Sequence, residues 1–112
     1  MPKLETMVVN SNKINQPITK LCKIKKYLPI KSKFEFAEQY KKVLAEHIKD
    51  YPEYPGYVGF LFFNLMAMQA YTDIEFELTY ESFDKFQERG WIDEIVGVIG
   101  SDYTLLLQLI KT

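Results

Sequence analysis

The sequence of 112 residues contains one histidine, His47, and one cysteine, Cys22. Structural zinc sites need four ligands, mostly histidine and cysteine, at set spacings, so these two residues cannot form one. A lone cysteine also excludes an internal disulfide, and nothing here requires an oxidising compartment. A histidine on the apolar side of a helix, near its C-terminal end, is typical of a packed residue. We therefore expect no metal site and two structural side chains.

Long apolar runs and targeting signals are also missing. The longest apolar stretch, residues 57–71, is interrupted by Gly59, Asn64 and Gln69. It is shorter than the roughly 20 residues that span a bilayer. The N-terminus has no basic segment followed by an apolar one, which argues against a secretory signal. These absences predict a cytoplasmic protein that has no membrane partner.

Glycine is scarce, and the five glycines match neither the Walker pattern nor the dinucleotide-binding pattern. The carboxylate pairs Glu75 with Glu77 and Asp93 with Glu94 are typical of exposed, solvated charges. No base stands near Cys22 in the sequence that would activate it as a nucleophile. We therefore expect no catalytic residue and no cofactor, and we expect that the protein is not an enzyme.

Aromatic residues, in contrast, are abundant: the chain has eight phenylalanines, eight tyrosines and one tryptophan. Each aromatic side chain buries roughly 150–250 Å², so the set can exceed what a small core holds and supply surface for protein contacts. The charge is polarised along the chain. Residues 1–50 carry eleven lysines and five acidic residues, a net charge of +6, and residues 51–112 carry a net charge of −7. This polarity fits attraction between the two halves of one fold, head-to-tail self-association, or docking onto charged partners.

The pattern of the chain predicts one domain, residues 1–112, of α+β class and mostly α. Residues 1–17 are expected to form an extended arm or a first strand, and residues 18–28 a second strand, because both contain β-prone runs on either side of turn-forming residues 10–13. Ser32 and Glu35 match a capping box, so a helix is expected to begin there. Further along, a helix is expected to begin at Thr79 or Tyr80 and to end at Gly90, and Gly100 is expected to end the next helix. The whole pattern predicts an N-terminal β-hairpin followed by a four- to five-helix bundle, residues 32–112.

The helix expected over residues 57–71 is apolar nearly all round, which is typical of a central helix. Either the other elements of the same chain cover it, or a second subunit does. The second alternative predicts an oligomer.

Two segments are candidates for partner binding. Tyr51, Tyr54 and Tyr57 flank a turn with two prolines, and tyrosine combines apolar area with a hydrogen-bonding tip, which suits an interface. Lys23, Lys25 and Tyr27 lie on the edge of the expected hairpin, where a partner strand could add. Lysines on such an edge also discourage strand pairing, which is the simpler interpretation.

Four short segments follow one another along the chain: KIKKYLPI at residues 23–30, MQAYTDIE at 68–75, FDKF at 83–86 and GWIDEIV at 90–96. In this order they resemble segments of a group of small proteins from the structural gene clusters of tailed phages. The resemblance covers residues 18–110, and its motifs mark structure rather than chemistry. The first thirteen residues look like an added arm, and the segment after Gly100 lacks a proline-glutamate turn that the pattern would place there.

The resemblance implies a tail-assembly chaperone, or an adaptor at the head–tail junction or in the tail. Its partners would be other phage structural proteins or further copies of itself, in the host cytoplasm or the virion. Two other classes fit the composition. One is a small inhibitor or regulator that binds a host or defence protein. The other is a nucleic-acid-binding protein, and the acidic half of the chain argues against this class. Such a protein would bind through a set of lysines, Lys20, Lys23, Lys25, Lys26, Lys31 and Lys33.

Overall fold

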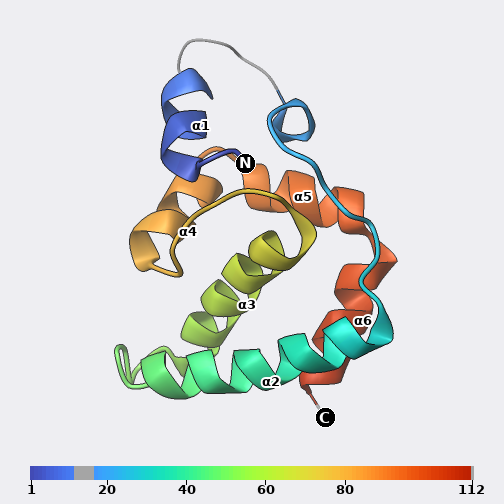
Figure 1. Ribbon diagram of the computed structural model, residues 1–112. Helices are drawn as coiled ribbons and strands as arrows, with labels where there is room; N and C mark the ends of the chain where they lie inside the picture. The colour runs from blue at the N-terminus through green and yellow to red at the C-terminus, as the bar shows by residue number, and fades with distance from the viewer. Residues whose placement is uncertain (12–16, 112) are drawn as a thin grey trace.

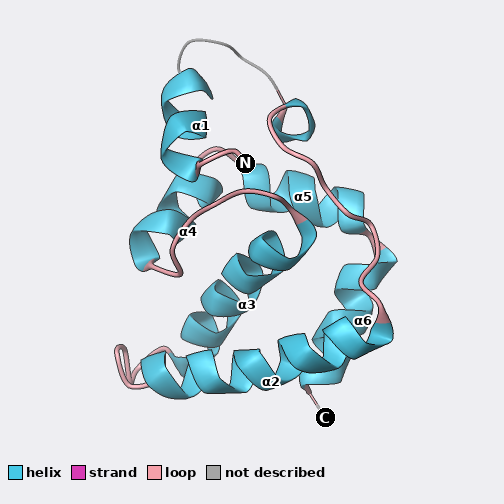
Figure 2. Cartoon of the chain, viewed as in Figure 1, coloured by secondary structure: helices cyan, strands magenta, loops and turns pink. Residues whose placement is uncertain are grey.

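The computed structural model describes residues 1–11 and 17–111, and this part of the chain is helical, without a β-strand (Figures 1 and 2). In chain order the elements are α1 (Leu4–Ser11), the short 3₁₀ helix η1 (Ile18–Lys20), α2 (Ile30–His47), α3 (Pro55–Tyr71), α4 (Tyr80–Gln87), α5 (Trp91–Ile99) and α6 (Ser101–Ile110). The expected helical bundle is present, formed by α2 to α6, and begins at residue 30 rather than 32. The α+β class with an N-terminal β-hairpin is wrong.

The first half of the expected hairpin is helix α1. Leu4 and Met7 are both buried, and their spacing of three residues places them on one face of a helix. An extended segment would have placed these two side chains on opposite faces. The β-prone residues Val8 and Val9 lie on the less buried side of the helix, so burial of the Leu4 and Met7 face outweighed their local preference.

The second half, residues 18–28, forms η1 and then an irregular extended segment. Ile18 and Leu28 are buried at its two ends, whereas the lysines between them are exposed. One isolated antiparallel bridge joins Ile24 to Thr72. Because residues 4–11 are helical, this segment has no neighbouring strand there with which to form a hairpin. The backbone N–H of Ile18 donates instead to the Glu94 carboxylate (3.0 Å).

Helix α3 forms the centre of the core, as expected for residues 57–71. Nearly every residue from Val58 to Met68 is buried, and α2, α4 and α5 all contact the helix. The ribbon in Figure 1 shows α3 enclosed by α2, α4 and α5, with the 72–79 segment passing over its end. The chain itself therefore covers most of this helix, and its exposed residues are 55–57 and Phe60 near the N-terminal end and Gln69 near the C-terminal end. The apolar character of α3 gives no reason to require a second subunit.

Helix α2 begins at Ile30, after Pro29, and the expected capping box is wrong because Ser32 lies inside the first turn. A buried ion pair marks this end of the helix. The Lys33 Nζ lies 2.9 Å from the Asp102 carboxylate of α6, and each residue is only 4% exposed. Lys33 Nζ also donates to the Leu28 carbonyl oxygen (2.6 Å), two residues before the helix. Lys33 was one of the lysines that the nucleic-acid-binding hypothesis would use, but in this buried position it cannot contact nucleic acid.

The same carboxylate joins three segments of the chain. Asp102 accepts hydrogen bonds from the Leu28 N–H (2.9 Å) and from the Tyr71 hydroxyl (2.6 Å). Burial alone would raise the pKa of Asp102, but the hydrogen bonds from Tyr71, Lys33 and Leu28 and the charge of Lys33 hold it below its usual value. This network (Leu28, Lys33, Tyr71, Asp102) fixes the start of α2 and the end of α3 against α6.

The C-terminal helices begin and end at the residues that carried the sequence signals. Thr79 caps α4, because its hydroxyl accepts a hydrogen bond from the Ser82 N–H (3.1 Å). Gly90 separates α4 from α5 with a φ of 70°, and Gly100 separates α5 from α6 with a φ of 66°. A side chain at either glycine would make these left-handed conformations costly.

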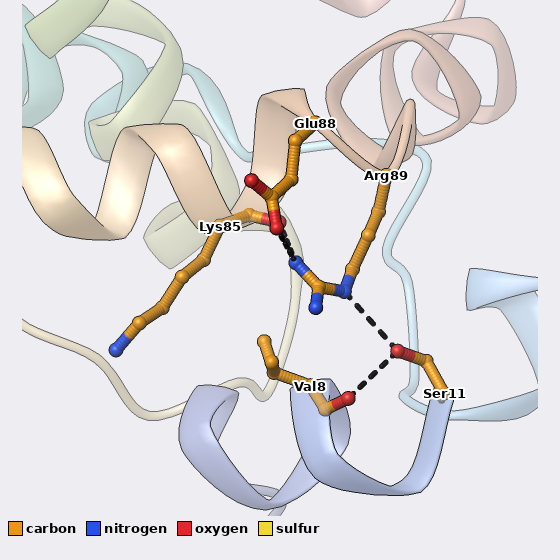
Figure 3. A network of polar contacts seen from close by, with 5 residues as sticks. All are labelled: Val8, Ser11, Lys85, Glu88 and Arg89. Carbon is orange, nitrogen blue, oxygen red and sulfur yellow. Dashed lines mark hydrogen bonds and ion pairs between the residues drawn. The ribbon is translucent and has the colours of Figure 1, made fainter. Parts of the chain in front are cut away.

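Helix α1 is attached to the turn between α4 and α5 through Arg89 (Figure 3). The Arg89 Nε donates to the Ser11 hydroxyl (3.1 Å), which in turn donates to the Val8 carbonyl oxygen (2.9 Å). Its Nη1 donates to the Lys85 carbonyl oxygen (3.2 Å) and pairs with Glu88 (2.6 Å). The C-terminal end of α1 is therefore fixed by polar contacts, and its buried face by Leu4 and Met7.

Candidate functional site

Tyr51, Tyr54 and Tyr57 lie together along an open hollow of about 390 Å³ at the end of α2 and the start of α3. We call this hollow the tyrosine groove; its lining residues are Tyr51, Tyr54, Tyr57, Val58, Leu61, Tyr80 and Asp84. The three predicted tyrosines are 52%, 62% and 59% exposed. Aromatic side chains of this size are rarely left exposed as a group unless they contact something.

The local sequence explains why the three rings gather. Residues 51–54 form a turn closed by a hydrogen bond from the Tyr54 N–H to the Tyr51 carbonyl oxygen (2.9 Å), so the two tyrosines stand at the ends of one turn. Pro55 then occupies the first position of α3, where its fixed φ suits a helix start. Tyr57 follows within the first turn of that helix. The prolines thus limit the backbone freedom of the segment that presents the rings.

The opposite wall of the groove comes from α4, which the sequence alone did not connect to this turn. Tyr80 packs edge-on against Tyr51 (ring centres 5.4 Å apart) and against Phe62 of α3 (5.4 Å). Asp84 lies one turn further along α4, on the same side, and Val58 and Leu61 form the buried floor. The sequence predicted a helix that begins at Thr79 or Tyr80, but the contact of this helix with the turn depends on how α4 packs on α3.

His47, Asp50 and Tyr80 form a polar cluster beside the groove. The His47 ring stacks on Phe62 (4.2 Å, 16°), and its Nδ1 lies 2.9 Å from the Asp50 carboxylate. The Tyr80 hydroxyl donates to the same carboxylate oxygen (2.8 Å). Hydrogen bonds from His47 and Tyr80 hold the pKa of Asp50 below its usual value, whereas burial and the bond to Asp50 raise the pKa of Tyr80 to about 12. At neutral pH the groove therefore has an ionised carboxylate and a neutral phenol at its edge.

The surroundings of the groove are acidic. Residues 48–57 and 80–84 contain one lysine, Lys49, and four carboxylates, Asp50, Glu53, Glu81 and Asp84, all of them exposed. This gives a net charge of −3 next to an aromatic surface. Aromatic faces and carboxylates both attract cationic side chains, so this combination favours lysine or arginine on a partner.

The other predicted residues, Lys23, Lys25 and Tyr27, lie elsewhere, on the extended segment that precedes α2. We call residues 20–31 the basic segment: it carries five lysines and no acidic residue. Lys23 and Lys25 line a separate hollow together with Asp73 and Glu75. Tyr27 is 62% exposed, and the Lys33 Nζ lies 4.1 Å from the centre of its ring. The structure therefore divides the predicted residues between two surfaces.

Within residues 1–11 and 17–111, no group of three or more histidine, cysteine or acidic side chains is placed to hold a metal ion. Burial, and then the charge of Asp73, raise the pKa of the Cys22 thiol to about 11, which leaves it almost entirely protonated at neutral pH. None of the helices described here is long and apolar enough to cross a membrane.

The chemistry that this arrangement supports is recognition by contact: an exposed aromatic hollow, an acidic rim, and a separate basic surface. Comparison of the chain with protein-family models, with curated proteins and with solved structures finds no match.

Proposed function

We propose that this protein is a non-enzymatic protein-binding component that acts in the assembly of a tailed-phage particle. The tyrosine groove is the observation that supports the proposal most directly. It presents three exposed tyrosines on a segment stiffened by two prolines, and its floor and far wall are already packed by α3 and α4. A preformed aromatic surface binds a partner with little loss of conformational entropy.

The specific role in phage assembly is suggested by the resemblance of residues 18–110 to small proteins of phage structural gene clusters. In that setting the partner would be a portal, capsid, tail or baseplate protein, or another copy of this chain. Tyrosines are enriched among the residues that dominate interface energetics. We therefore expect loss of Tyr54 and Tyr57 to weaken capture of the partner by at least tenfold.

The test is affinity capture of the tagged protein from its native cells, followed by mass spectrometry of the co-purified proteins. The groove variant is Tyr54→Ser with Tyr57→Ser. The matched control is Leu105→Ser, because Leu105 is 51% exposed on α6 and does not line the groove. Structural proteins of a particle that are captured by the wild type and the control, but not by the groove variant, would support the proposal.

Two results would contradict it. Capture of one host enzyme in a 1:1 complex would favour the inhibitor hypothesis. Capture of the same phage proteins by the groove variant would show that the tyrosines are not the binding site. Blotting of purified particles would then separate a component that stays in the particle from a chaperone that leaves it.

A further inference from the structure

The tyrosine groove and the basic segment lie at opposite ends of α2. The basic segment ends in the first turn of this helix, which begins at Ile30, and the tyrosine turn follows within a few residues of the last helical residue, His47. Eighteen helical residues at about 1.5 Å each separate the two surfaces by roughly 27 Å. Figure 1 shows α2 running across the molecule between them. The two surfaces therefore cannot touch within one molecule.

The charges of the two ends are complementary. The basic segment carries +5, and the residues around the groove carry −3. The backbone dipole of α2 has the same direction, positive at the N-terminal end and negative at the C-terminal end. Lys23 and Lys25 line a hollow together with Asp73 and Glu75, whereas Lys26 and Lys31, which precede and follow the exposed Tyr27 in the sequence, are exposed and form no ion pair among the described residues.

We propose that the tyrosine groove of one copy binds the basic segment of a second copy, so that the protein associates head to tail. Tyr27 of one molecule enters the hollow between Tyr54 and Tyr80 of the next. Lys26 and Lys31 then face Glu53 and Asp84. Rings of opposite molecules gain edge-to-face contacts, and the lysines gain contacts with carboxylates and ring faces.

A contact between two different surfaces of the same chain leaves one free surface at each end of a dimer. Such a contact continues to further copies, and it produces either a closed ring or an open filament. The inference rests on the proposed function, since it names the occupant of the same groove. Self-association can nevertheless be tested separately from the proposed function, because another particle protein could bind the groove of a monomer.

The experiment measures the mass of the purified full chain by analytical ultracentrifugation over a concentration series in low salt, about 20 mM, where contacts between exposed charges are least screened. The expected result is an average mass that rises with concentration above the 13.2 kDa of one chain. Raising the salt to about 500 mM should weaken the association several-fold, because the Debye length then shrinks to a few ångströms.

Two charge-reversal variants test the surfaces. The first is Lys26→Glu with Lys31→Glu, and the second is Glu53→Lys with Asp84→Lys; all four residues are exposed, so circular dichroism should show unchanged helix content. Each variant alone should remain a monomer at concentrations where the wild type associates. An equimolar mixture of the two should associate again, because each then offers the other a complementary surface.

A photo-crosslinking residue at position 54 gives an independent measurement. It should form crosslinks to residues 26–31 of a second, isotopically labelled copy. A wild-type mass that stays at one chain across the series would overturn the inference, and so would association that neither variant reduces. If the wild type stays monomeric and affinity capture still depends on Tyr54 and Tyr57, only self-association is refuted and the proposed function stands.

Discussion

The ion pair between Lys33 and Asp102 provides the most demanding test of how this fold is held together. Both residues are 4% exposed and their charged atoms are 2.9 Å apart. Removal of one member of a buried pair leaves the other charge without compensation and costs about 3–5 kcal/mol. A protein of this size is stable by roughly 5–15 kcal/mol. Either Asp102→Asn or Lys33→Met should therefore remove a large fraction of the free energy of unfolding.

The double variant, Lys33→Met with Asp102→Asn, separates the contribution of the buried charges to stability from that of the hydrogen bonds. With both substitutions no buried charge remains, so the loss should be smaller than the sum of the two single losses by at least about 1 kcal/mol. Some loss of stability should remain in the double variant. The Leu28 carbonyl oxygen no longer has Lys33 as a donor, and the Leu28 N–H and the Tyr71 hydroxyl no longer have a carboxylate as acceptor. Each buried polar group without a good partner costs about 1–3 kcal/mol.

The assay is urea unfolding followed by circular dichroism and by the fluorescence of the buried Trp91. The control is Lys31→Met, an exposed lysine of the same helix, for which the change should stay within about 0.5 kcal/mol. Single losses below about 1 kcal/mol, or strictly additive losses, would refute the reasoning, because they would mean that the pair contributes nothing specific to the fold.

The pH dependence of stability follows from the same carboxylate. The folded protein holds the pKa of Asp102 below its usual value, so this group stabilises the fold fully above the unfolded pKa of about 3.9. The contribution is lost as the pH falls through the lower, folded pKa. In Asp102→Asn this acid-dependent part of the unfolding curve should be reduced, which unfolding measured at several pH values would reveal.

Three further substitutions and one alkylation experiment test single elements of the structure. Gly97→Ala should stabilise the protein by about 0.5–1 kcal/mol, because the position is helical and has open space around it. Gly90→Ala should destabilise the protein by about 1 kcal/mol or more, because Gly90 has a φ of 70°. The thermal unfolding temperatures of the two variants should therefore shift in opposite directions. Thr79→Ala removes the cap that accepts from the Ser82 N–H, and urea unfolding should show a loss of about 1 kcal/mol. Alkylation of Cys22 at pH 8 should be slower by at least about tenfold in the native protein than in urea, because its pKa is raised from 9.0 to about 11 and the greater nucleophilicity of the thiolate offsets only part of this effect. Equal rates would contradict this.

Much of the helical part could be predicted from the sequence, because its signals act over a few residues. Thr79, Gly90 and Gly100 mark helix ends through their own backbone conformation or their nearest hydrogen bonds. The mostly apolar run at residues 57–71 predicted a buried helix, whichever elements surround it. The exposed tyrosines of the turn could be proposed as a surface because two prolines interrupt the helices on either side.

The tertiary structure alone decided three other matters. Residues 4–11 became a helix because a complementary apolar site exists for Leu4 and Met7, and β-propensity yields to such packing. In the sequence, Lys33 cannot be told from a surface lysine; it is buried because α6 places Asp102 beside it. The Asp102 carboxylate also accepts a hydrogen bond from the Leu28 N–H, and these two residues are 74 positions apart in the sequence. The groove itself needed α4 to place Tyr80 and Asp84 opposite the tyrosine turn. In each case the determining contact joins segments far apart in the chain, and patterns within a short stretch of sequence carry no record of such a contact.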